Sequence, residues 1–108
     1  MGKSNKVNIA AGLFEAFNYE QISVTNSVKT LTEAKYLGSD GEYAKRVIIT
    51  VEDAPVRYNY DGSTPTSDLG HRLNPTDVLV IIGTRNIQNF KCIRQGSSNG
   101  EINASYEK

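Results

Sequence analysis

Residues 45–62 read KRVIITVEDAPVRYNYDG, and this stretch decides how the chain is expected to fold. Apolar side chains occupy every second position from Val47 to Val51, and again from Val56 to Tyr60. This period of two is typical of strands with one buried face. The proline between the two halves cannot donate a hydrogen bond to a β-ladder, and the final Asp-Gly pair is a turn signal. The stretch therefore predicts two strands joined by a tight connection.

The composition limits the class of protein. A chain of 108 residues has room for one hydrophobic core and one domain. Its 12 Lys and Arg residues balance 12 Asp and Glu residues, so no net field attracts nucleic acid or an anionic membrane. No stretch approaches the roughly 20 apolar residues of a membrane span, and the weakly apolar N-terminal run is short for a secretory signal. We expect neither a nucleic-acid nor a membrane partner.

Further strands are predicted on both sides of the central stretch. Upstream, residues 22–25 alternate apolar and polar side chains. Downstream, residues 78–82 read VLVII, an apolar run on both faces that favours a strand at the centre of the core, covered on both sides. Residues 90–94 and 102–106 are predicted to form a hairpin through the turn at 97–100.

The intervening segments are predicted from their turn and capping residues. Within residues 28–37, either Thr30 or Thr32 is expected as an N-cap, and with Glu33 in the first turn it favours a short helix or a turn. A second short turn carries Ile87. Residues 61–71 are rich in Gly, Pro, Ser, Thr and Asp, which indicates an exposed loop. A further short strand is possible at 69–73.

Together these elements predict an all-β protein, an antiparallel β-sandwich or a jelly-roll-like fold with one or two short helical turns. Residues 1–19 are assigned to an N-terminal arm, and residues 20–108 to a single β-sandwich domain. The predicted core residues are Ile22, Val24, Val47, Ile49, Val51, Val56, Tyr58, Val78, Val80, Ile82, Phe90, Cys92, Ile102 and Ala104.

The N-terminal arm has an apolar side that needs to be covered. Leu13, Phe14 and Phe17 fall at roughly helical spacing among alanines. Such a surface is unfavourable in water unless it packs against something. Two arrangements satisfy this requirement: the arm lies along its own domain, or it docks on a neighbouring subunit.

No pattern in the sequence points to catalysis, a metal or a cofactor. His71 is the only histidine, which rules out a zinc site with two histidines, and a triad would need Cys92 or a serine brought to it. Cys92 is the only cysteine and is interpreted as a small buried hydrophobic residue. The scattered aspartates are interpreted as turn formers rather than calcium ligands. We expect a protein without enzymatic activity.

Aromatic and basic side chains leave binding alternatives open. A stacking platform for sugars would use four tyrosines: Tyr43, Tyr58, Tyr60 and Tyr106. Strands also favour tyrosine for packing, so the carbohydrate-binding module is kept as the alternative function. Arg57 and Arg72 lie among acidic residues, which favours ion pairs or subunit contacts over nucleic-acid binding.

The order of motifs in residues 44–106 resembles that of small virion-associated β-sandwich proteins of tailed bacteriophages and prophages. The matching segments are PVRYNYDGSTPT at 55–66, GHRL at 70–73, DVLVII at 77–82 and IQNFKCIR at 87–94, preceded by TLTEAKY at 30–36. The resemblance implies a virion component such as a head decoration or cement protein, or a neck or tail accessory. It implies no catalytic residue.

The expected function is therefore structural. The protein would bind other virion proteins and further copies of itself, as a homo-oligomer in a virion assembled in the host cytoplasm. A small hydrolase or isomerase would require polar groups that converge in a cavity. The candidate partner-contact residues are Leu13, Phe14, Phe17, Arg57, Tyr60, His71 and Arg72.

Overall fold

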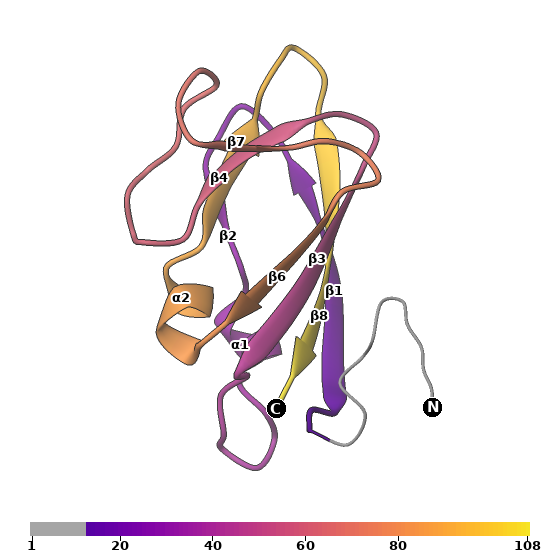
Figure 1. Cartoon of the computed structure of the whole chain (residues 1–108), viewed down its shortest axis with the longest axis vertical. Helices are drawn as coiled ribbons and strands as arrows, with labels where there is room; N and C mark the ends of the chain where they lie inside the picture. Colours follow the sequence, from indigo (N-terminus) through magenta and orange to yellow (C-terminus); the bar gives the residue numbers. More distant parts are fainter. Residues whose placement is uncertain (1–12) are drawn as a thin grey trace.

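A computed structural model describes residues 13–108 as two four-stranded antiparallel sheets with two short helices (Figure 1). The elements are β1 (Ala16–Val24), β2 (Lys29–Thr30), α1 (Glu33–Tyr36), β3 (Arg46–Glu52), β4 (Val56–Asn59), β5 (His71–Leu73), β6 (Val78–Ile82), α2 (Thr84–Gln88), β7 (Lys91–Arg94) and β8 (Gly100–Glu107). The predicted all-β sandwich is confirmed.

The two sheets differ in the length of their strands. One sheet has the order β1-β8-β3-β6 and is called the long sheet. The other has the order β2-β7-β4-β5 and is called the short sheet. Figure 1 shows the four strands of the long sheet side by side, with α1 and α2 near one end of the molecule.

The core lies between the sheets and follows the predicted alternation. On β3, Val47, Ile49 and Val51 are buried, and on β8 they pair with Tyr106, Ala104 and Ile102. Because paired residues in adjacent strands point to the same face, these six side chains form one apolar layer. Val56, Tyr58 and Cys92 from the short sheet pack against it, as does Phe90, which directly precedes β7.

The predicted hairpin of residues 90–94 and 102–106 is wrong. The strand β7 lies in the short sheet between β2 and β4, whereas β8 lies in the long sheet between β1 and β3. Residues 95–99 therefore cross from one sheet to the other, as residues 53–55 do between β3 and β4. The two crossings pass so closely that a Cβ added at Gly100 would lie 2.6 Å from the carbonyl oxygen of Ala54. A Gly-rich turn sequence alone does not tell a hairpin from such a crossing.

The predicted central position of residues 78–82 is also wrong. β6 is an edge strand, because it lies at the end of the long sheet beside β3. Its inward residue Ile81 is buried, whereas Val78, Val80 and Ile82 are exposed and do not belong to the core. Ile22, on β1, is only partly buried as well. An apolar run shows that both faces of a strand carry apolar side chains. It does not show that other parts of the same chain cover both faces.

The boundary of the N-terminal arm needs correction. β1 begins at Ala16 and pairs with β8 up to Glu107, so residues 16–19 belong to the long sheet. Phe17 is therefore a strand residue, and the helical spacing that groups it with Leu13 and Phe14 has no structural counterpart there. The part of the proposed arm formed by residues 1–12 lies outside the described residues.

The helix α1 is attached to the long sheet through Glu20. Thr32, one of the two candidate N-caps, occupies the N-cap position but makes no side-chain cap. Its backbone N–H and its hydroxyl instead donate to the Glu20 carboxylate, at 3.0 and 2.7 Å. The hydroxyl of the buried Tyr106 donates to the same carboxylate at 2.5 Å. The pKa of Tyr106 is raised, mainly by burial and secondly by this hydrogen bond to Glu20. One surface carboxylate thus joins α1, β1 and β8.

Candidate protein-interaction surface

Three of the four edge strands carry features that discourage pairing with another chain. β2 has only two residues, and β5 has three, of which His71 and Arg72 are exposed. β1 carries polar and charged side chains, and its register with β8 shifts between Ala16 and Asn18. Short length, charge and register irregularity are known means by which proteins protect sheet edges.

The fourth edge, β6, has none of these features. Its five residues, Val78–Ile82, are all aliphatic, without charge or proline. Within residues 13–108 its only neighbouring strand is β3. An apolar edge without charge or proline favours association with another strand.

The free backbone groups of β6 can be identified from one hydrogen bond. The N–H of Gly83 donates to the carbonyl of Lys45 at 2.7 Å, in the same register as the β3–β6 ladder. Since hydrogen-bonded and non-hydrogen-bonded pairs alternate in antiparallel strands, Ile81 and Leu79 are bonded to β3. The N–H and C=O groups of the other three residues point away from β3, toward the open edge.

The same three residues also expose their side chains. The relative exposure is 52% for Val78, 47% for Val80 and 62% for Ile82. We call these three side chains the β6 stripe. Ile48 on β3 lies directly beside Val80 in the register and is half-buried, so the apolar surface continues onto the next strand.

The open side of the sandwich lies next to the stripe. A hollow of about 280 Å³ is lined by residues from β6, the end of β4 and α2: Tyr58, Tyr60, Leu79, Val80, Ile81, Ile82 and Asn86. At one end of β6, the side-chain amide of Asn86 donates to the carbonyl of Ile82 at 2.9 Å. This bond confirms that the carbonyl of Ile82 faces away from β3, and it fixes the end of the free edge.

Among the predicted contact residues, the structure brings Tyr60 and His71 together. Their ring centroids are 6.4 Å apart, and both rings lie near Tyr58, at 6.5 and 5.3 Å. Both side chains are exposed, and Tyr60 also lines the hollow beside the stripe. Tyr60 therefore lies close to β6, and His71 lies beside Tyr60.

The two predicted arginines lie on a different face. Arg57 and Arg72 are register partners on the outer side of the short sheet. Arg57 donates to the carbonyl of Gly70 at 3.0 Å, and Arg72 donates to the side chain of Asn74 at 2.8 Å. Both arginines thus donate hydrogen bonds within the domain, to residues directly before and directly after β5, which is a structural role.

The apolar residues near the N-terminus are divided between their own domain and solvent. The ring of Phe14 lies 4.2 Å from the guanidinium carbon of Arg46, on the outer face of the long sheet. The ring of Phe17 lies 4.7 Å from the ammonium of Lys108. Leu13 is 79% exposed. Two of the three predicted anchors thus contact the chain to which they belong.

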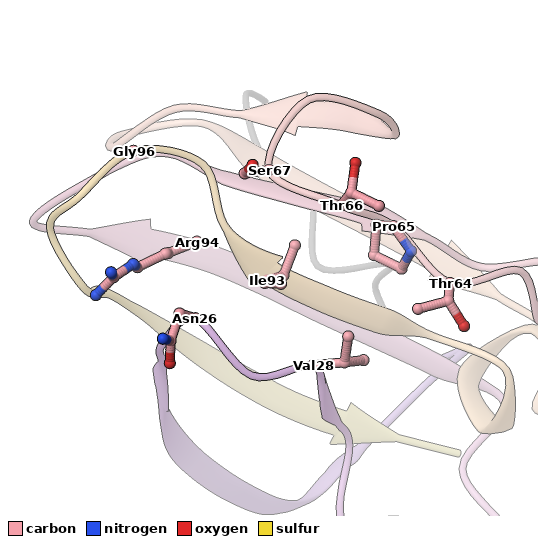
Figure 2. A pocket seen from close by; sticks show the side chains of 9 residues that line it. All are labelled: Asn26, Val28, Thr64, Pro65, Thr66, Ser67, Ile93, Arg94 and Gly96. Atoms are coloured by element: carbon pink, nitrogen blue, oxygen red, sulfur yellow. The ribbon is translucent and has the colours of Figure 1, made fainter.

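A second hollow, of about 520 Å³, lies over the short sheet (Figure 2). Val28, Pro65 and Ile93 meet there from three different segments, with Arg94, Asn26 and the hydroxyl residues at the rim. The guanidinium of Arg94 already donates to the side chain of Asn99 at 2.8 Å. The lining is mixed and does not select one class of ligand.

The side chains that a catalytic thiol, a ligand site at Asp61 or a sugar-stacking platform would require are buried or hydrogen-bonded within the domain, apart from Tyr60. Cys92 is buried, and burial raises its pKa to about 12, the opposite of an activated thiol. Asp61 accepts hydrogen bonds from the N–H and hydroxyl of Ser63 at 3.0 and 2.5 Å, which is a turn. Tyr58 and Tyr106 are buried and Tyr43 is partly so, which leaves Tyr60 as the exposed member of the suggested sugar platform.

Two further observations concern the described part of the chain. Across residues 13–108, no group of three or more His, Cys, Asp or Glu side chains is placed to hold a metal ion. In that same part, neither helix is long and apolar enough to cross a membrane.

Comparisons with protein-family models, curated proteins and solved structures found no match to this chain.

Sequence reasoning missed the β6 stripe, although it singled out the run that contains it. The signal in VLVII is the absence of any polar residue, which predicts burial on both faces. The same absence of polar residues also fits a strand that its own domain covers on one face and that leaves the other face for a partner. No residue in the run distinguishes these two arrangements.

Proposed function

We propose that this protein is a structural virion component of a tailed bacteriophage, without enzymatic activity, that acts by binding other virion proteins. The order of motifs in residues 44–106 supports the virion context. The role as a binding protein is supported by the β6 stripe, which combines exposed aliphatic side chains with an edge that pairs with no strand other than β3 among residues 13–108.

The β6 stripe is the single observation that carries the proposal. Its three members belong to one strand and one face, and Ile48 and Tyr60 extend the apolar surface on either side. Exposed aliphatic side chains scattered singly are ordinary on a protein surface, but a contiguous group on a sheet edge is typical of an interaction site. Many copies on one particle would make even weak contacts of this kind sufficient.

The proposal is tested by asking whether the protein is part of the particle. The phage or prophage genome that encodes the chain is induced, virions are purified by density gradient, and the chain is quantified against the major capsid protein by mass spectrometry. We expect a fixed stoichiometry that survives further gradient steps. A chain that remains with the host lysate and is absent from intact particles would refute the virion assignment.

A second arm of the same experiment tests the surface. Val80→Lys is introduced into the encoding genome, with Val28→Lys as the control, because Val28 is also an exposed valine but lies away from β6. We expect Val80→Lys to reduce the amount of this chain in particles and Val28→Lys to leave it unchanged. Equal incorporation of the two variants would exclude the β6 stripe as the binding surface.

A further inference from the structure

We infer that the partner of the β6 edge is the β6 strand of a second copy, paired antiparallel about a two-fold axis at Val80. This inference rests on the proposed function, because it names the partner of the same surface. It is carried by three properties of β6, which are the direction of its backbone groups, its side-chain pattern and its lack of charge.

The backbone groups of β6 are complementary to themselves. With Val80 opposite Val80 of the second copy, Val78 lies opposite Ile82, and the outward N–H and C=O groups of all three positions face one another. Each of these pairs becomes a hydrogen-bonded pair of the new ladder. The carbonyl of Ile82 already accepts one bond from Asn86 but has a second lone pair.

The side chains are also self-complementary in this register. The exposed residues of the two strands form one row, in which valine meets valine at the centre and isoleucine meets valine on each side. On the other face, Leu79 lies opposite Ile81, and both are core-facing residues. A shift of one position would place exposed residues opposite core-facing ones, so this pattern favours an in-phase register.

Charge does not oppose the pairing of identical strands. A two-fold axis brings each residue near its own copy, so a charged strand would place like charges close together. β6 has no charged residue, unlike β5 with Arg72 and β1 with Glu20. The other strand edges of the domain therefore disfavour self-pairing, and β6 permits it.

The test uses variants of the full chain that each carry one introduced cysteine besides the buried Cys92, under mild oxidation. In the proposed pair the Cα atoms of residue 80 are about 5.5 Å apart, which is within the disulfide range. Residues 78 of the two copies are offset by four positions, about 13 Å along the strand, which is beyond that range. Val80→Cys is thus expected to form a disulfide-linked dimer, and Val78→Cys to form no covalent dimer.

Two controls complete the test. The unaltered chain should give no covalent dimer, because Cys92 is buried. The double variant Val78→Cys/Ile82→Cys should link again, since those positions face each other in the proposed register. Free-thiol labelling of each monomer establishes that the introduced thiols are accessible and reduced before oxidation begins.

The outcomes are distinct. A reactive thiol at position 80 that gives no dimer would overturn self-pairing through β6, and equal cross-linking of Val78→Cys and Val80→Cys would show non-specific apolar association instead. Neither result bears on the amount of this chain found in purified virions, so self-pairing can be refuted while the virion assignment stands. Conversely, a specific Val80→Cys dimer of a chain absent from virions would refute the proposed function alone.

Discussion

Replacing Glu107 with leucine should destabilise the protein by about 3–5 kcal/mol, because the change leaves the guanidinium of Arg46 buried without its counter-ion. The side chains are 10% exposed for Arg46 and 2% for Glu107. Arg46 Nε donates to Glu107 Oε1, and the ring of Phe14 lies over the guanidinium at 4.2 Å. Leucine is similar in volume to glutamate, so the main effect is the loss of charge rather than a cavity.

The magnitude follows from the asymmetry of buried ion pairs. Desolvation opposes the pair as a whole, and a well-packed apolar replacement of both partners is often neutral or stabilising. Removal of one partner keeps the desolvation cost of the other and loses the attraction. Against the about 5–15 kcal/mol stability of a typical domain, 3–5 kcal/mol is a large fraction.

The assay is equilibrium urea unfolding at neutral pH and low protein concentration. With an m value of about 2 kcal/mol/M, the midpoint of Glu107→Leu should fall by about 1.5–2.5 M. The double variant Arg46→Met/Glu107→Leu is the matched control and should recover most of this loss. A Glu107→Leu midpoint within about 0.5 M of the unaltered protein would refute the reasoning, because a buried, unpaired guanidinium would then cost almost nothing.

Further predictions concern three residues, Cys92, Gly100 and Glu20. Burial raises the pKa of Cys92 to about 12, so its thiol should resist thiol reagents at pH 8 until denaturant is added, and rapid labelling of the folded protein would contradict its burial. Because an unfolded thiol ionises near pH 8.5 and the folded one does not, this group should lower stability progressively between about pH 8.5 and 12. Gly100→Ala should cost about 1–3 kcal/mol by thermal unfolding, since its Cβ would lie 2.6 Å from the carbonyl oxygen of Ala54; an unchanged melting temperature would show that the two crossings separate easily. Glu20→Ala should cost about 1–3 kcal/mol in the urea assay, because the hydroxyl of the buried Tyr106 loses its acceptor, and a neutral effect would mean that water replaces it.

The central strands could be predicted because one physical rule governs them. In residues 46–52 and 56–59, alternate side chains must enter a shared core, and the sequence alternates accordingly. The same rule identified Ile102 and Ala104 on β8, and Cys92 on β7, as core residues. Local turn composition was enough to predict the exposed loop of residues 61–71, where Thr66 Oγ1 accepts from the N–H of Leu69 at 3.0 Å.

Sheet membership could not be predicted in the same way. Whether residues 95–99 return a strand to its neighbour or carry it to the other sheet depends on contacts with residues 53–55, which are distant in sequence. The arm boundary failed for a related reason, since Phe17 belongs to a strand only because β8 lies beside it. Local sequence carries little information on such long-range pairings.

The candidate surface was the least predictable part. Tyr60 and His71 can each be singled out in the sequence, but the position of Tyr60 beside β6 arises from the packing of two sheets. Val78, Val80 and Ile82 were assigned to the core because their chemistry is that of core residues. A residue that binds another subunit and a residue that binds its own core satisfy the same hydrophobic requirement.

The most direct test of the β6 stripe as the association surface is the solution mass of the protein by light scattering on a sizing column, across a range of concentrations. The unaltered chain, of 11.9 kDa, is expected to rise toward twice that mass with concentration. Val80→Lys should remain at the monomer mass, and Val28→Lys should behave like the unaltered chain. A monomer at every concentration, or association of Val80→Lys equal to that of the unaltered chain, would contradict the account.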